Sequence, residues 1–277
     1  MMQQKCSPFL YIAIAFVFLF SSGSIHAQSA ELNAARNLFD AGNFVAALAQ
    51  TDALLAKDED NADAWTLSGR VRLAMKDVKG AETDLQKAIQ LDDSNGEAKL
   101  YLGVVLYLTG KYKESIQQLD KAEKLLPNDY KVYFNRALSW EELPNLNKSI
   151  ADLDKALSIK PDFINGYLKR SEMYFELENF KESIADCNRA IGIDSTNAEA
   201  YFRRGIALGG EAKDKEAVAD FNKAIELKPN HDEALTYRGA AKLLSGNKKG
   251  ACLDWKRAME LGNDMAEENY TKYCESN

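Results

Sequence analysis

The sequence predicts an all-α solenoid, because one helical hairpin is repeated along nearly its whole length. Taken every 34 residues from Gln28, the chain divides without insertion or deletion into seven repeats: 28–61, 62–95, 96–129, 130–163, 164–197, 198–231 and 232–265. Position 8 of each repeat is always Ala, Gly or Ser, and position 20 is always Ala or Ser. Each repeat has two stretches with the 3.6-residue periodicity of amphipathic helices, separated by turn residues. We therefore expect a single domain of stacked hairpins over residues 28–277.

The first 27 residues precede the repeats and have the pattern of a secretory signal peptide. Lys5 is followed by an apolar run from Phe9 to Phe20 and then by a tail of small residues. We expect cleavage after about Ala27 and a periplasmic or secreted location. An uncleaved membrane anchor is the alternative, but the apolar run is shorter than the about 20 residues that span a bilayer.

Within each repeat, the small residues at positions 8 and 20 allow the two helices to approach closely where they cross. Larger apolar residues at position 24, such as Leu85 and Leu119, fill the space between the helices. Pro127, Pro161 and Pro229 stand at position 32, where the second helix must stop.

After the seventh repeat, we expect a capping helix over residues 266–277, because the last hairpin would otherwise expose its apolar flank. Cys252 lies on the second helix of that hairpin and Cys274 on the cap. In an oxidising compartment these two cysteines could form a disulfide. The alternative is a buried free thiol at Cys252, since the equivalent position is apolar in repeats three to six. Cys187 takes the apolar position 24 of repeat five, so we expect it to be free and buried.

Arginine occupies position 7 in repeats four to seven, always together with aspartate at position 23 of the same repeat. The pairs are Arg136 with Asp152, Arg170 with Asp186, Arg204 with Asp220, and Arg238 with Asp254. A guanidinium on the first helix can pass apolar neighbours to reach a carboxylate on the second. We expect these residues to be structural ion pairs rather than a ligand site.

No motif predicts catalysis. The net charge is −7, and only His231 remains after signal cleavage, since His26 lies before Ala27. An acidic chain is a poor partner for nucleic acid, and one histidine leaves few metal or acid–base sites. Phosphate-binding loops and nucleophile elbows are absent from the sequence. We therefore expect no enzymatic activity, no metal, no cofactor and no nucleic-acid partner.

The Leu-Gly pair at Leu102, the Gly110-x-Tyr112 turn, the small residue Ser115 and Pro127 of repeat three resemble the tetratricopeptide repeat family. The resemblance covers nearly all of the mature chain and implies a right-handed superhelix that binds a protein or peptide partner in a concave groove. Carried onto this sequence, the family's groove positions give Leu100, Val104, Tyr107, Phe134, Leu138, Leu168, Phe175, Phe202 and Ile206.

The C-terminal segment is similar to the ending of tetratricopeptide proteins that Gram-negative bacteria export. An exported scaffold or adaptor is the favoured function, with no membrane span after signal cleavage. The alternative is a non-catalytic subunit or specificity module of a cell-envelope enzyme complex. A further alternative is that the groove binds nothing, because its side chains cover one another.

Overall fold

The computed structural model describes residues 29–275, and every regular element in this range is helical. The predicted all-α fold of successive helical hairpins is confirmed. The described residues form two compact units, one before and one after the Pro127–Asn128 bond, and each is treated by itself. The predicted signal peptide lies outside the described residues.

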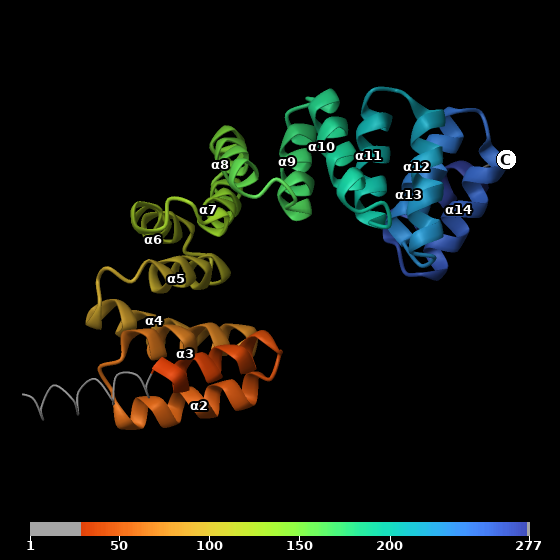
Figure 1. The fold of residues 1–277 in the computed structure, drawn as a ribbon. Coiled ribbons are helices and arrows are strands. Elements are labelled where there is room, and N and C mark those ends of the chain that lie inside the picture. Colours follow the sequence, from red (N-terminus) through yellow and green to blue (C-terminus); the bar gives the residue numbers. More distant parts are fainter. Residues whose placement is uncertain (1–28, 276–277) are drawn as a thin grey trace, which may run out of the picture. The chain divides into compact units, whose positions relative to one another are not determined.

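The N-terminal unit, residues 29–127, begins with a helix over residues 29–40. The helices that follow are α2 (Phe44–Lys57), α3 (Ala62–Ala74), α4 (Val78–Leu91), α5 (Gly96–Leu108) and α6 (Tyr112–Leu125). Consecutive helices pack against one another in chain order (Figure 1). Leu54, Leu67 and Leu85 are among the fully buried side chains that hold this stack together.

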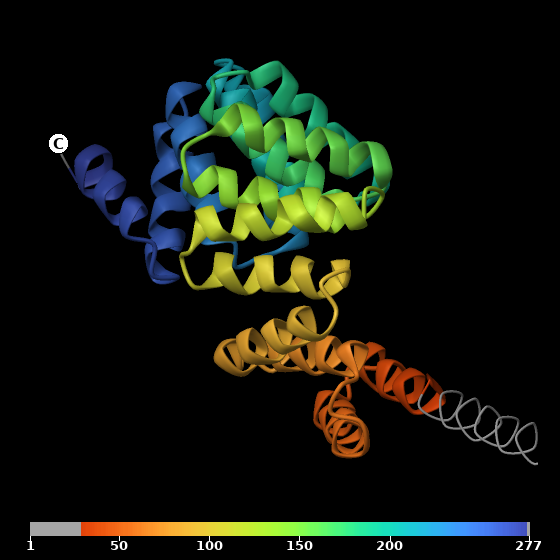
Figure 2. The ribbon, with the colours of Figure 1, turned by 90° about the vertical axis from the view of Figure 1, so that its left-hand side faces the viewer.

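The C-terminal unit, residues 128–275, continues the same arrangement of helices. Its elements are α7 (Tyr130–Glu142), α8 (Leu146–Ile159), α9 (Ile164–Glu176), α10 (Phe180–Ile193), α11 (Ala198–Gly210), α12 (Asp214–Leu227), α13 (Asp232–Leu244), α14 (Lys248–Glu260), α15 (Asp264–Tyr270) and a π-helical turn, η1 (Thr271–Glu275). The capping segment α15 and η1 packs on α14 at the chain's C-terminal end (Figure 2). It starts two residues before the predicted cap, because Asn263 accepts a hydrogen bond from the Ala266 amide and thereby caps α15.

The helices of a hairpin cross where a small residue meets a large one. A Cβ added to Gly69 would lie 2.6 Å from Leu85 Cγ, and one added to Gly205 would lie 2.7 Å from the Phe221 ring. At these two crossings a larger side chain would force the facing residue to shift, because real Cβ atoms do not approach so closely. Close packing of the two helices of a hairpin therefore explains why position 8 is always a small residue.

The turns inside the hairpins use one backbone conformation at position 15 in every repeat except repeat four, which has Pro144 there. Gly110 and Gly246 have φ values of 74° and 87°, in the left-handed region that glycine adopts without strain. Glu178 and Ala212 take the same conformation at 58° and 56°. This left-handed residue ends the first helix and directs the chain into the second.

Candidate functional site

Each of the four position-7 arginines makes two hydrogen bonds to the aspartate of its own hairpin. Arg204, for example, donates from Nε and Nη2 to the two carboxylate oxygens of Asp220, both at 2.7 Å. The same bidentate contact joins Arg136 to Asp152, Arg170 to Asp186 and Arg238 to Asp254. Burial raises the pKa of Asp186, although its bonds to Arg170 oppose that change.

Arg170, Arg204 and Arg238 also reach back to the preceding hairpin, which the sequence analysis missed. Arg204 donates to Asn188 Oδ1 at 2.6 Å, and Arg238 donates to Asn222 Oδ1 at 2.8 Å. Arg170 donates in the same way to Asp154. Each of these guanidiniums therefore joins three helices. Such a contact ties neighbouring repeats together and leaves few donors for a ligand.

Three of the nine predicted groove residues are core residues instead. Leu100, Leu168 and Phe202 are only 1%, 8% and 6% exposed. The Phe202 ring lies 4.6 Å from His231 and 5.8 Å from Tyr237, measured between ring centroids. Placing these three on the groove surface was wrong, because position 5 points between helices rather than outward.

The other six predicted groove residues are half-buried and are divided between the two units. Val104 and Tyr107 belong to the N-terminal unit, where the Tyr107 ring packs on Tyr112 at 5.8 Å. Phe134 packs on Phe163 at 4.9 Å and lies on α7 together with Leu138. Phe175 and Ile206 line an open cavity. The strongest candidate site is therefore in the C-terminal unit.

A hollow lies along α9, α11 and α13. Phe175, Ile206 and Tyr237, one from each helix, line two adjoining cavities of about 250 and 230 Å³. The first cavity reaches the hydroxyls of Ser171 and Ser183. The second is lined by Gly209, Gly210, Ala240 and Leu244, among others. We call the two cavities together the α9–α11–α13 groove.

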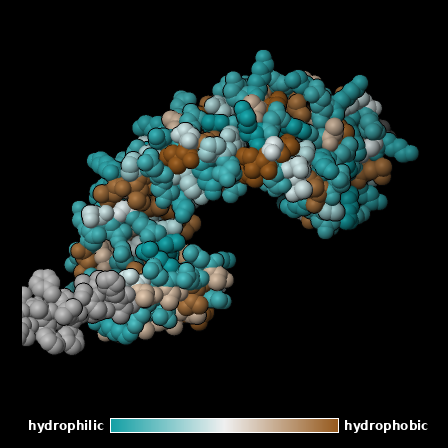
Figure 3. Space-filling view, viewed as in Figure 1, coloured by the Kyte–Doolittle hydropathy of each residue, from teal (hydrophilic) through white to brown (hydrophobic). Residues whose placement is uncertain are grey.

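The face drawn in Figure 3 is mostly hydrophilic, with hydrophobic residues in separate patches. Leu244, which lines the second cavity, is nevertheless 73% exposed. A large apolar side chain that is open to water beside a cavity is typical of a binding surface.

A chain of ion pairs runs beside the groove over α7, α9 and α11. Lys169 Nζ lies 3.1 Å from Glu141 and 2.9 Å from Glu172. Arg203 lies 3.1 Å from Glu172 and 2.6 Å from Glu199. Burial alone would raise the pKa of Glu172, but Lys169 and Arg203 outweigh burial and lower it. Burial raises the pKa of Glu141 in spite of Lys169.

Lys169, Arg203 and Tyr237 stand at position 6 of repeats five, six and seven, a position that the sequence analysis did not select. Neighbouring residues on a helix are separated by about 100° of rotation, so a shift of one position exchanges core for surface. The available signal was the charged residue at position 6 beside an apolar position 5 in repeats five and six, whereas repeat seven has Thr236 at position 5 and gives no such signal.

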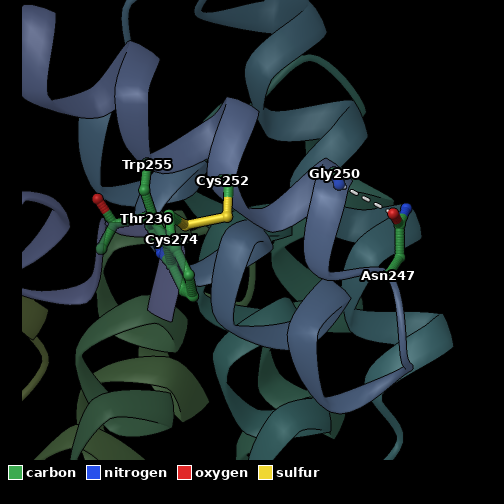
Figure 4. The surroundings of a disulfide bond; sticks show 6 residues. All are labelled: Thr236, Asn247, Gly250, Cys252, Trp255 and Cys274. Carbon is green, nitrogen blue, oxygen red and sulfur yellow. Dashed lines mark hydrogen bonds between the residues drawn. A yellow bond between two sulfur atoms is a disulfide. The ribbon is translucent and has the colours of Figure 1, made fainter. Parts of the chain in front are cut away.

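The capping segment is held by a disulfide between Cys252 and Cys274, whose Cα atoms are 5.8 Å apart (Figure 4). Beside it, the Trp255 indole donates to the Thr236 carbonyl at 3.0 Å and stacks on Tyr273. Cys187 is free and buried, and burial raises its pKa to about 11. This thiol is therefore protonated and unreactive at neutral pH.

Within residues 29–275, no three His, Cys, Asp or Glu side chains are grouped so that they could hold a metal ion. None of the helices that the structure describes is long and apolar enough to span a membrane.

Solved structures support the same fold. A chain of the APC/C hetero-tetramer Cut9-Hcn1 superimposes with a TM-score of 0.70 at 14% identity, over 87% of this chain and 48% of that one. This protein thus spans about half the length of that chain. A tetratricopeptide repeat protein from Parabacteroides merdae superimposes with a TM-score of 0.62 at 19% identity, over 89% of this chain and 98% of that one. YrrB is described as a TPR protein with an unusual peptide-binding site. It superimposes with a TM-score of 0.58 at 19% identity, over 68% of this chain and 97% of that one.

No curated protein matches the sequence. Tetratricopeptide repeat profiles match residues 32–96 and 72–135, and a third profile matches 130–163, 164–197 and 198–231. These matches extend without a gap from residue 32 to residue 231, and the chain belongs to the tetratricopeptide repeat family.

Proposed function

We propose that this protein is a non-catalytic scaffold that binds a peptide segment of a partner protein in the α9–α11–α13 groove. Tetratricopeptide repeats are in general protein-interaction modules, and YrrB is described as having a peptide-binding site. The observation that carries the proposal is the preformed cavity between Phe175, Ile206 and Tyr237. Concave, largely apolar surfaces with a few polar groups are typical of binding sites.

The charges beside the groove support binding rather than catalysis. Lys169, Arg203, Glu172 and Glu199 already neutralise one another through short contacts. A general acid or base needs a group with a free proton site near its substrate. Side chains fixed in mutual ion pairs are better suited to orienting a ligand.

We further propose that the protein acts outside the cytoplasm. The first 27 residues have the composition of a signal peptide, and Cys252 and Cys274 form a disulfide. Disulfides persist in oxidising compartments such as the periplasm. A periplasmic or secreted scaffold fits both observations.

The experiment is a selection of random peptides on the mature protein, followed by affinity measurements on two matched variants. Gly209 and Gly192 are each the next-to-last residue of their helices, α11 and α10, and neither has another group within 4 Å of an added Cβ. Gly209 lines the groove, whereas Gly192 lies outside it. Both Gly→Leu changes raise helix propensity, so neither is expected to harm folding.

We expect Gly209→Leu to weaken selected peptides by about tenfold or more, because the new side chain occupies the groove, and Gly192→Leu to leave their affinity unchanged. Equal affinities for wild type and both variants would contradict the proposed groove.

A further inference from the structure

Repeat five has the smallest pair of side chains at its hairpin crossing in the C-terminal unit. In repeats two, three, four, six and seven, the crossing pairs a small residue at position 8 with a large one at position 24. These pairs are Gly69 with Leu85, Gly103 with Leu119, Ala137 with Leu153, Gly205 with Phe221, and Gly239 with Trp255. In repeat five the pair is Ser171 and Cys187, whose side-chain oxygen and sulfur are 3.1 Å apart. Two small side chains stand where the other three hairpins of the C-terminal unit hold Leu153, Phe221 or Trp255.

The first cavity of the groove opens at this hairpin. Ser171 and Ser183 line its floor, each only 1% exposed, with their hydroxyl oxygens 3.3 Å apart. Phe175, Ile206 and Tyr237 form apolar walls. Its volume of about 250 Å³ lies below the about 300–1,000 Å³ of small-molecule sites, which suits a single side chain rather than a cofactor.

The charges around this cavity are unbalanced toward negative. Its rim and the adjoining ion pairs hold the carboxylates of Glu141, Glu172, Glu176 and Glu199 against the cations Lys169 and Arg203. Four carboxylates and two cations leave a local charge of −2. Glu176 lines the cavity, is exposed, and makes no ion pair with any described residue. A cation on the ligand would therefore find an unoccupied partner at the rim.

We propose that the repeat-five cavity is an anchor pocket for one large apolar side chain of a peptide that carries lysine or arginine next to that anchor. The cavity takes the apolar side chain between Phe175, Ile206 and Tyr237, and Glu176 pairs with the flanking cation. This assignment rests on the proposed function and specifies the chemistry of its partner.

The test uses labelled synthetic peptides of the form Gly-Ser-Lys-Phe-Lys-Ser-Gly, titrated by fluorescence polarisation against the mature protein. In the companion peptides, Phe is replaced by Leu or Ala, and both Lys residues by Gln or Glu. We expect the Lys-flanked Phe and Leu peptides to bind most tightly, and the Ala and Glu-flanked peptides to bind about tenfold more weakly. Equal or tighter binding of the Glu-flanked peptides would overturn the proposal.

Two substitutions locate the effect on the protein. Glu176→Lys reverses the rim charge and is expected to weaken the Lys-flanked peptides about threefold, in keeping with an exposed pair. Glu182→Lys is the matched control, because Glu182 is exposed on α10 and lines neither cavity, and it should change nothing. Identical affinities for the two variants would contradict the role of Glu176.

Filling the pocket is the second test. Ser171→Gly combined with Cys187→Leu gives repeat five the Gly–Leu pair of repeats two and three, so we expect the melting temperature to be kept or raised. The Lys-flanked Phe peptide should lose about tenfold or more in affinity. Should this variant fail to fold, Ile206→Trp provides a filling variant on the exposed side of the cavity, with the same expected loss. Undiminished binding by a folded filling variant would overturn the pocket.

The failure of this inference is distinguishable from failure of the proposed function. One outcome is that the library peptides bind wild type and lose affinity for the Gly209→Leu variant, yet show no preference for an apolar anchor beside a cation. That result overturns the anchor pocket alone and leaves the groove in place. If no selected or synthetic peptide distinguishes Gly209→Leu from Gly192→Leu, both proposals are overturned.

Discussion

At the scale of single residues, the arginine–aspartate pairs show how one side chain can stabilise a repeat array. Arg204 bonds to Asp220 in its own hairpin and to Asn188 in the preceding one, and its guanidinium lies 5.5 Å from the Tyr201 ring centroid. The pairing of positions 7 and 23 could be predicted from the sequence, because arginine never occurred without aspartate. The contact to the preceding hairpin could not be predicted, because its acceptors Asn188, Asn222 and Asp154 are not all charged and so leave no charge pattern in the sequence.

Removing one partner of this pair tests its structural role. We expect Arg204→Met to lower the free energy of unfolding by about 2 kcal/mol, measured by urea denaturation. This is less than the about 3–5 kcal/mol lost on breaking a fully buried pair, because the Arg204 side chain is 24% exposed.

The matched control is Lys223→Met, which removes an exposed ion pair to Glu226 at 2.6 Å in the same unit. Exposed pairs contribute about 0–1 kcal/mol, so the change should be small. Equal losses in the two variants would mean that the arginine pairs are no more structural than a surface contact.

His231 gives a pH dependence whose sign follows from its surroundings. It is 2% exposed against Phe202, and burial lowers its pKa, with Lys228 acting in the same direction and Glu199, Glu233 and Asp232 opposing. The folded state therefore binds the proton more weakly than the unfolded state. The stability that this residue contributes is present above its ordinary pKa of about 6.5 and is lost as the pH falls below it.

The measurement compares urea unfolding of wild type and His231→Phe at about pH 7.5 and about pH 5. Phenylalanine keeps a ring against Phe202 but cannot be protonated. We expect wild type to lose more stability on acidification than the variant. The same loss in both proteins would show that His231 does not titrate between these values.

At the scale of elements, the sequence predicted the helical hairpins well, because their periodicity, small crossing residues and turns recur in every repeat. It placed the groove less well. Position 5 was assigned to the surface, but Phe202 and Leu168 are buried, and position 6 supplies Arg203 and Tyr237 to the groove instead. Periodicity identifies the apolar stripe of a helix, but the edge of that stripe depends on how far neighbouring helices cover it.

The capping segment is the element whose stability depends on a covalent bond. The Cys252–Cys274 disulfide closes a loop with a sequence separation of 22 residues. On the chain-entropy estimate, such a bond stabilises the folded state by about 3 kcal/mol. We expect a reductant to lower the melting temperature of the wild type, and the Cys252→Ala, Cys274→Ala double variant to be insensitive to it.

Thiol titration of the unfolded, unreduced mature chain checks the bond itself. The result should be one reactive thiol, from Cys187, which is the free cysteine of the described chain. A value of three would mean that the bond is absent in solution.

At the scale of the whole molecule, a recurring hairpin explains both what could be predicted and what could not. Every repeat obeys the same packing rules, so the all-α class followed from the sequence. Binding depends on where repeats differ, as at Ser171 and Cys187, and the consequence of a missing large side chain depends on what surrounds it. The cavity beside these residues could therefore be identified only from the structure.

The most direct test of the account is photo-crosslinking from the groove with a peptide selected from the random library. Benzoylphenylalanine replaces Tyr237 in one protein and exposed Glu182 in a control. We expect the peptide to crosslink strongly from position 237, weakly from position 182, and much less from position 237 when Gly209→Leu is also present. Equal crosslinking from both positions, or crosslinking that Gly209→Leu leaves unchanged, would contradict binding in the α9–α11–α13 groove.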